Sequence, residues 1–129
     1  MKTILLVDDD IFIVRALQAV LARAGYDVHI ARNGMQALAV LDTTAIQLVI
    51  TDLRMPDLGG PEIIEVLRSH SQQPPIIVIS GDVRARSMTE SLLKVDVVLS
   101  KPVNTHELLA HVSRLFPRAF NSDPARNLN

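Results

Sequence analysis

The sequence has no cysteine and few aromatic residues. Without cysteine the chain forms neither disulfide bonds nor metal sites built on thiolates, and this composition suits a reducing compartment. Aromatic residues make up only 3% of the sequence, so few rings are available to stack against a planar cofactor such as a flavin. These absences disfavour disulfide-stapled folds, thiolate metal modules and flavin carriers.

A surplus of positive charge and a long apolar run are also missing. The formal net charge is −1, which gives no electrostatic attraction toward phosphate backbones or anionic lipids, so we expect no direct binding to nucleic acid. No apolar run approaches the roughly 18 residues of a membrane span. Residues 4–7 are followed by aspartates before a signal-peptide core is complete. We therefore expect a cytoplasmic protein that does not engage a membrane.

Short apolar runs recur along the chain and predict strands. With 129 residues and 48% apolar content, the sequence has the size of one domain with one core. Residues 4–7, 48–50 and 76–79 are too short for helices and rich in β-branched side chains, which favours buried parallel strands. Residues 28–30 alternate as an edge strand does, and residues 97–99 predict the last strand.

Helical spacing of apolar residues appears between and after these runs. The spaced positions are Ile11, Val14, Leu17 and Leu21; Met35, Leu38 and Leu41; Ile63, Ile64 and Leu67; Met88 and Leu92; and Leu108, Val112 and Leu115. Asn104 with Glu107 resembles a capping box that predicts the start of the last helix, and Pro117 predicts its end. We expect one domain over residues 1–117 and a polar tail or linker stub over residues 118–129.

The order of these elements predicts the fold. Strand and helix alternate five times, which favours a flavodoxin-like (βα)5 fold of the α/β class, a doubly wound parallel sheet with strand order 2-1-3-4-5. In that order the carboxyl ends of strands 1 and 3 border the switch point, where open α/β sheets bind their ligands. The side chains at these strand ends therefore decide the function.

Charged and hydroxyl side chains stand at four of the predicted strand ends. Aspartates occupy residues 8–10 after strand 1, Asp52 ends strand 3, Ser80 ends strand 4, and Lys101 follows strand 5. Carboxylates about 4 Å apart repel each other by about 4 kcal/mol per pair at an effective dielectric near 20, so their convergence requires a cation, and oxygen ligands favour Mg²⁺. Phosphoryl transfer needs such charge neutralisation. The pattern predicts Asp52 as nucleophile, Lys101 as point charge and Ser80 as hydroxyl donor.

Four motifs carry a resemblance to a known family. They are ILLVDDD at residues 4–10, TDLRMP at 51–56 with Gly60 after it, VISG at 78–81 and SKP at 100–102. In this order they resemble the chemotaxis-regulator-like receiver domain of two-component response regulators, from residue 3 to about residue 117. The resemblance implies that Asp52 receives a phosphoryl group from a sensor histidine kinase or phosphotransfer protein. A conformational change would then regulate a downstream effector that the sequence does not identify.

The resemblance also implies a ligand set for Mg²⁺. Asp9 would bind the ion directly, Asp8 mainly through water, and the phosphoacceptor Asp52 would share it. The backbone carbonyl of Arg54 would complete the protein's share of the ligands. A Mg²⁺ cofactor is therefore expected at the carboxyl ends of strands 1 and 3.

Further roles follow from the same resemblance. Ser80 and Lys101 would contact the phosphoryl oxygens, and the peptide bond between Lys101 and Pro102 would be cis. The family usually places an aromatic residue at the switch position, which swings inward on phosphorylation, whereas this chain has Val98 there. Coupling to the output is therefore expected to rely on other residues.

Two more positions are expected to modulate the lifetime of the phosphorylated form. Arg54, two residues after the phosphoacceptor, and Asp82, two residues after Ser80, would lie on opposite lips of the cleft and pair across it. The domain would not be an enzyme acting on other substrates, but would catalyse its own phosphorylation and dephosphorylation. A homodimer is left open.

Three other functions compete with this interpretation. A pseudo-receiver of the same fold would not need the acidic residues, Ser80 and Lys101 that this chain keeps. A Mg²⁺ phosphohydrolase would want a second aspartate two residues after the nucleophile, where Arg54 stands. A flavin module is disfavoured because the acidic site would repel a flavin phosphate and few aromatic residues are present to stack on the ring. A nucleotide-binding enzyme is disfavoured separately, because the sequence has no glycine-rich phosphate loop of the G-x-x-x-x-G-K type.

Overall fold

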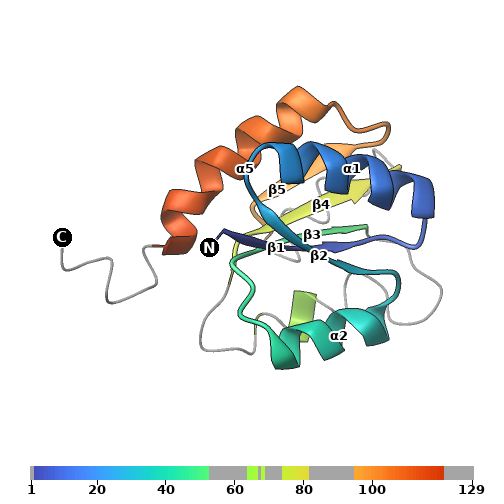
Figure 1. Ribbon diagram of the computed structural model, residues 1–129, viewed down its shortest axis with the longest axis vertical. Helices are drawn as coiled ribbons and strands as arrows, with labels where there is room; N and C mark the ends of the chain where they lie inside the picture. The colour runs from blue at the N-terminus through green and yellow to red at the C-terminus, as the bar shows by residue number, and fades with distance from the viewer. Residues whose placement is uncertain (1, 53–63, 67, 69–73, 82–94, 121–129) are drawn as a thin grey trace.

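The computed structural model describes residues 2–52, 64–66, 68, 74–81 and 95–120 (Figure 1). Its elements are β1 (Thr3–Val7), α1 (Ile11–Arg23), β2 (Asp27–Ala31), α2 (Gly34–Thr43), β3 (Leu48–Asp52), β4 (Ile76–Ser80), β5 (Val97–Ser100) and α5 (Thr105–Phe120). Residues 64–66 are also helical. All five predicted strands are confirmed. Met88 and Leu92, which predict a further helix, lie outside the described residues.

The strands form one parallel sheet in the order β2-β1-β3-β4-β5, as predicted. Helices α1 and α5 cover one face of this sheet, and α2 covers the other (Figure 1). The doubly wound α/β fold is therefore confirmed. Within the described ranges, no helix combines the length and apolar character needed to cross a membrane.

Each strand contributes to two apolar clusters because successive side chains point to opposite faces of a sheet. In β1, Ile4 and Leu6 pack in the cluster that includes α1 and α5, while Leu5 and Val7 pack in the cluster that includes α2. All four side chains are buried. This double burial explains why the strand reads as an unbroken apolar run, and each such side chain contributes about 1.5–3 kcal/mol when it leaves water.

Helix α1 begins at an aspartate cap and ends at a glycine turn. The carboxylate of Asp10 accepts hydrogen bonds from the backbone N–H groups of Phe12 at 2.9 Å and Ile13 at 3.4 Å, which stabilises the first turn. Gly25 follows the helix with φ of 96°, a conformation that favours glycine. The buried side chains are Val14, Leu17 and Leu21, as the spacing predicts.

Helix α2 turns a different face to the sheet from the one that its sequence suggests. The spacing of Met35, Leu38 and Leu41 predicts the buried face, but Met35 is 63% exposed and the buried residues are Gly34 and Ala37. Leu41 is partly buried against the core. The prediction for Met35 was wrong because small residues face the sheet here and allow the helix backbone to approach it, so the buried stripe is shifted along the helix.

Helix α5 begins as predicted but runs longer. The carboxamide oxygen of Asn104 accepts a hydrogen bond from the Glu107 N–H at 3.0 Å, which confirms the predicted cap. The prediction that Pro117 ends the helix was wrong, since the helix continues to Phe120. Proline removes one N–H donor, but its fixed φ of about −65° is compatible with helical backbone. The predicted inward side chains Leu108, Val112 and Leu115 are buried.

Two polar side chains complete the hydrogen bonding where strands begin. The Gln47 side chain accepts from the Thr3 N–H at 2.8 Å, while the Gln47 N–H donates to the Thr3 carbonyl at 3.0 Å. Asp96 does the same for Ile76: its carboxylate accepts from the Ile76 N–H at 2.8 Å, and its own N–H donates to the Ile76 carbonyl at 3.0 Å. At the amino end of the sheet, polar side chains therefore accept hydrogen bonds from the first backbone N–H groups of the strands.

Candidate phosphoacceptor and metal site

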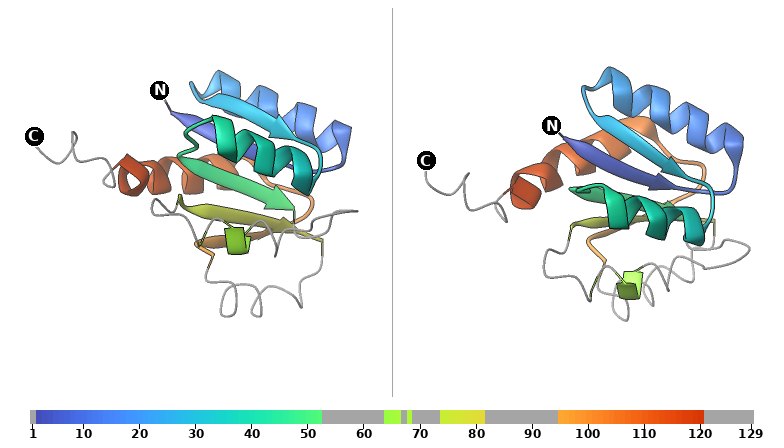
Figure 2. Two further views of the ribbon diagram at one scale, coloured as in Figure 1. Left: turned by 90° about the horizontal axis from the view of Figure 1, so that it is seen from below. Right: turned by 60° about the horizontal axis from the view of Figure 1, so that its bottom comes forward.

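The predicted strand ends meet at one edge of the sheet. Val7 in β1 is paired with Thr51 in β3, so the residues that follow them, Asp8 and Asp52, leave neighbouring strands at the same level. Asp52 is in turn paired with Ile79 of β4. Figure 2 shows β2 and β3 pointing the same way, as parallel strands must. Parallel pairing therefore gathers side chains that are far apart in sequence.

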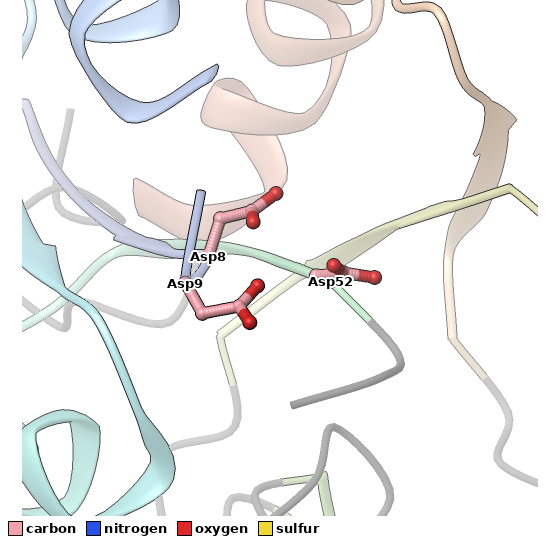
Figure 3. A group of neighbouring side chains, drawn as sticks. All are labelled: Asp8, Asp9 and Asp52. Carbon is pink, nitrogen blue, oxygen red and sulfur yellow. The ribbon is translucent and has the colours of Figure 1, made fainter. Parts of the chain in front are cut away.

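Three carboxylates from two strand ends share a small space. Asp8, Asp9 and Asp52 each offer an oxygen atom, and these atoms lie within 4.8 Å of one another (Figure 3). Asp8 is 2% exposed and Asp52 is 7% exposed, whereas Asp9 is open to solvent. Oxygen ligands at this spacing, with one side open to water, suit Mg²⁺, which keeps several of its own waters.

The position of Asp8 is fixed by backbone contacts on both sides. Its N–H donates to the Ala31 carbonyl at 3.1 Å, and its carboxylate accepts from the Asp10 N–H at 3.0 Å. Burial raises the pKa of Asp8 above its usual value, and the charge of Asp52 adds to this, while the Asp10 N–H and Lys101 act in the opposite direction. A cation beside Asp8 would therefore relieve an electrostatic cost that the fold imposes.

Lys101 links the two buried carboxylates. Its ammonium nitrogen lies 2.9 Å from Oδ2 of Asp52 and 3.3 Å from Oδ2 of Asp8. Burial acts to lower the pKa of Lys101, but the hydrogen bond and charge of Asp52, followed by Asp8, outweigh burial and raise the pKa. The lysine is therefore charged at neutral pH. The Lys101 N–H donates to the Ser80 carbonyl at 3.0 Å, and the peptide bond to Pro102 is cis, as the resemblance implies.

The charges of these four residues do not cancel. Three carboxylates less one ammonium leave two negative charges, which is the charge that one Mg²⁺ would neutralise. All the side-chain atoms that could bind the metal are carboxylate oxygens. Each of the two Lys101 ion pairs uses one oxygen of its carboxylate, Oδ2 of Asp52 and Oδ2 of Asp8. The residues present thus fit a single divalent cation.

The family model described as the response regulator receiver domain matches residues 4–113. The chain belongs to this family. It is a receiver domain of two-component response regulators. The match covers β1 through most of α5, so it includes every strand end of the acidic site.

Curated relatives and solved structures agree with this assignment. The transcriptional regulatory protein CpxR homolog of Haemophilus influenzae is 33% identical over 129 residues, 100% of this chain and 56% of the relative, and CpxR of Escherichia coli K12 is 33% identical over 98% of this chain and 54% of the relative. The receiver domain thus spans about half the length of the curated relatives that it matches.

Among solved structures, the receiver domain is similar to the CheY-like protein of Methanospirillum hungatei, with a TM-score of 0.85 and 27% identity over 95% of this chain and 98% of that one. It is also similar to the response regulator TrrA of Thermotoga maritima, solved in complex with Mg²⁺-BeF, with a TM-score of 0.81 and 33% identity over 89% of this chain and 99% of that one.

Ser80 and Val98 occupy different parts of the receiver domain. Ser80 is buried at the end of β4, one residue beyond the partner of Asp52, and so lies at the edge that holds the carboxylates. Val98 is 3% exposed in the middle of β5, paired with Val78 and packed in the cluster that includes α2. Its branched side chain carries no ring that could rotate between two positions.

Two residues that the sequence predicts to modulate the site are not among those that the structure describes. Arg54 and Asp82 lie outside the described residues, so the metal ligand expected from the Arg54 carbonyl and the pairing with Asp82 stay predictions. One contact at the site was missed by sequence reasoning. The Arg32 guanidinium donates to the Asp9 carbonyl at 3.0 Å, across 23 residues of sequence. No spacing rule links the two positions, because only strand pairing brings them together.

Proposed function

We propose that Asp52 accepts a phosphoryl group from a sensor histidine kinase or phosphotransfer protein in a Mg²⁺-dependent reaction in the cytoplasm. The observation that supports this most directly is the buried Asp52 carboxylate, which has the Lys101 ammonium at 2.9 Å and the carboxylates of Asp8 and Asp9 within 4.8 Å. A carboxylate in this setting is both a nucleophile and part of a cation site, which are the two properties that phosphoryl transfer to an aspartate requires.

The metal ligands in this proposal are Asp8, Asp9, Asp52 and the backbone carbonyl of Arg54. The TrrA structure with Mg²⁺-BeF supports the choice of ion for a relative of this kind. When bound, Mg²⁺ supplies charge neutralisation for the phosphoryl oxygens. The net charge of the chain, −1, gives no reason to include direct contact with nucleic acid or a membrane.

The reaction needs little from the protein besides position and charge. A carboxylate oxygen of Asp52 forms a bond to phosphorus while the phosphorus–nitrogen bond of the donor phosphohistidine breaks, and the electron pair leaves with the imidazole nitrogen. Lys101 and Ser80 contact the phosphoryl oxygens. Attack by water on phosphorus later releases phosphate and restores the Asp52 carboxylate. The domain thus catalyses its own phosphorylation and dephosphorylation, without turnover of another substrate.

The test is labelling with a small phosphodonor such as acetyl phosphate, measured by intact mass. Asp52→Asn abolishes the label, whereas the control Asp42→Asn, which changes an exposed carboxylate of α2, leaves it unchanged. A chelator abolishes the label in the wild-type domain and in the control variant. Full labelling of Asp52→Asn would contradict the assignment. Failure of the folded wild-type domain to bind beryllofluoride with Mg²⁺ would favour a pseudo-receiver, and sustained hydrolysis of a phosphate monoester would favour a phosphohydrolase.

Conformational coupling in this proposal runs through Ser80 and the segment that follows β4. Val98 has no ring to flip, and a phosphoryl group must bias some element that has two states. Amide exchange measured with and without beryllofluoride changes over residues 81–93. A change confined to the neighbourhood of Val98 would rule this proposal out.

The lifetime of the phosphorylated form is proposed to depend on Arg54 and Asp82. An exposed pair is worth only about 0.2–1 kcal/mol of stability, but a bridge across the mouth of the site would hinder the approach of water. Arg54→Ala and Asp82→Ala each speed the loss of phosphate, and the double variant adds little more, as one shared interaction requires. Fully additive effects would rule out the bridge.

The output of the whole protein is a separate proposal, because the chain spans about half the length of its curated relatives. We propose that the phosphorylated domain, residues 1–117, acts on a downstream effector by direct contact, with residues 118–129 as a tail or linker stub. Light scattering with and without beryllofluoride distinguishes a monomer from a homodimer.

A further inference from the structure

The turn that carries the acidic residues is tied to the turn before α2 at two points. The Asp8 N–H donates to the Ala31 carbonyl at 3.1 Å, and the Arg32 guanidinium donates to the Asp9 carbonyl at 3.0 Å. The first contact continues the pairing of β1 with β2. The second is made by a side chain that crosses from one turn to the other, so it adds a constraint that the sheet itself does not supply.

Asp9 is the carboxylate for which such a constraint matters most. Asp8 and Asp52 are buried, and Lys101 contacts both, whereas Asp9 is exposed at the open side of the group. Burial and packing therefore fix the first two carboxylates, while the direction of the Asp9 side chain depends more on its own backbone. A hydrogen bond to the Asp9 carbonyl acts on that backbone directly.

Arg32 is itself held by the start of α2. Its backbone N–H donates to the Gln36 side-chain oxygen at 2.8 Å, and the Gln36 N–H donates to the Asn33 side-chain oxygen at 2.8 Å. These two hydrogen bonds, which resemble a capping box, fix the backbone from which the long side chain extends. The entropy lost on ordering the guanidinium is smaller because the Arg32 backbone is already fixed. The contact to the Asp9 carbonyl is therefore favoured although the Arg32 side chain is exposed.

We propose that Arg32 is a positioning residue of the Mg²⁺ site: by holding the Asp9 carbonyl, it keeps the Asp9 carboxylate directed toward Asp8 and Asp52. The inference rests on the proposed function, since it assumes that Asp9 is a metal ligand. Groups that orient metal ligands commonly change affinity or activity by about 10- to 100-fold when they are removed.

The charge of Arg32 acts in the opposite direction, which makes the sign of the effect informative. The guanidinium contacts the Asp9 carbonyl and so adds positive charge close to the cation site, which repels an incoming cation; through charge alone, its removal would tighten Mg²⁺ binding. Its removal as an anchor weakens binding. Because the side chain is exposed, solvent and salt screen the charge effect more than the geometric one, and we expect the loss of the anchor to win.

The experiment compares Arg32→Met with Arg23→Met, which removes the same charge from the last turn of α1. Mg²⁺ affinity is measured by calorimetry at physiological salt, and the melting temperature is measured in chelator. For Arg32→Met we expect Kd to rise about three- to tenfold, below the usual range because the lost repulsion offsets part of it. For Arg23→Met we expect no weakening, and for both variants an unchanged melting temperature.

Three other outcomes separate the possible failures. Wild-type Kd retained or lowered in Arg32→Met would overturn the inference while leaving the proposed function intact. A lower melting temperature in chelator with unchanged Kd would show a merely structural role and would also overturn it. Absence of Mg²⁺ binding by the wild-type domain would instead defeat the proposed function on which the inference rests.

Discussion

The two ends of the sheet use the same residue type for opposite purposes. At the amino end, the Asp96 carboxylate accepts the Ile76 N–H at 2.8 Å and so extends the backbone ladder. At the carboxyl end, the Asp52 carboxylate lies 2.9 Å from the Lys101 ammonium and close to two other carboxylates. The partner, and not the residue type, decides whether an aspartate stabilises the fold or prepares a reaction.

The difference has an electrostatic basis. A backbone N–H is neutral, so a carboxylate that accepts one hydrogen bond from it leaves only its own single negative charge at that place. Three carboxylates with one ammonium keep two negative charges together, which costs stability until a cation arrives. The amino end is therefore optimised for folding, while the carboxyl end retains an unfavourable arrangement that a ligand relieves.

The largest expected effect comes from removing the Lys101 ammonium group at the carboxyl end of the sheet. Lys101→Met deletes the group that contacts Asp52 and Asp8, so the rate of phosphodonor labelling falls by about 10²–10³. In chelator the free energy of unfolding falls by about 1–3 kcal/mol, since the buried carboxylates lose a hydrogen-bond donor, and Mg²⁺ restores part of it. Labelling kinetics and urea melts with and without Mg²⁺ measure both effects.

Lys2→Met is the matched control for this prediction, because it removes the same charge at the amino end of the sheet. It leaves the rate of labelling unchanged. If Lys101→Met labelled within twofold of wild type, the contrast between the two ends would lose its basis.

An intermediate effect is expected at the amino end. Asp96→Ala leaves the buried Ile76 without the acceptor of its N–H, which lowers the free energy of unfolding by about 1–3 kcal/mol, whereas Asp96→Asn keeps an acceptor oxygen and costs less. Mg²⁺ affinity stays at the wild-type value in both variants. Denaturant melts and calorimetry on the same samples test this, and weaker Mg²⁺ binding in Asp96→Ala would show that the two ends are not independent.

The smallest effect distinguishes neighbours within the acidic turn. Asp10→Ala removes the cap of α1 and costs about 1 kcal/mol of stability, while Asp10→Asn is nearly neutral because asparagine caps equally well. Mg²⁺ affinity changes less than twofold, since the Asp10 carboxylate is engaged by the Phe12 and Ile13 N–H groups and the contact to Asp8 comes from the Asp10 backbone. A Kd raised as much as in Asp9→Ala would make Asp10 a ligand and contradict this division.

Sequence reasoning succeeded where one local pattern has one structural solution. Unbroken apolar runs such as residues 4–7 can only be buried on both faces, and Asn104 before Glu107 has the spacing of a helix cap. It failed where neighbours in space decide. The exposure of the Met35 side chain depends on which face of α2 packs against the sheet. The continuation of α5 past Pro117 depends on whether the helix tolerates the loss of one backbone N–H donor.

The sequence by itself determined where the strands lie, which side chains stand at each strand end, and the motifs typical of the family, because these follow from local periodicity and residue order. The strand order was expected from the alternation of strands and helices together with the rule of right-handed crossovers, and pairing in the sheet confirmed it. Only the tertiary structure decided which polar groups find each other. Three such contacts join positions 20 or more residues apart: the ion pairs of Lys101 with Asp52 and Asp8, the hydrogen bond from the Ile76 N–H to Asp96, and the hydrogen bond from Arg32 to the Asp9 carbonyl. Parallel pairing sets these distances, and no sequence periodicity encodes them.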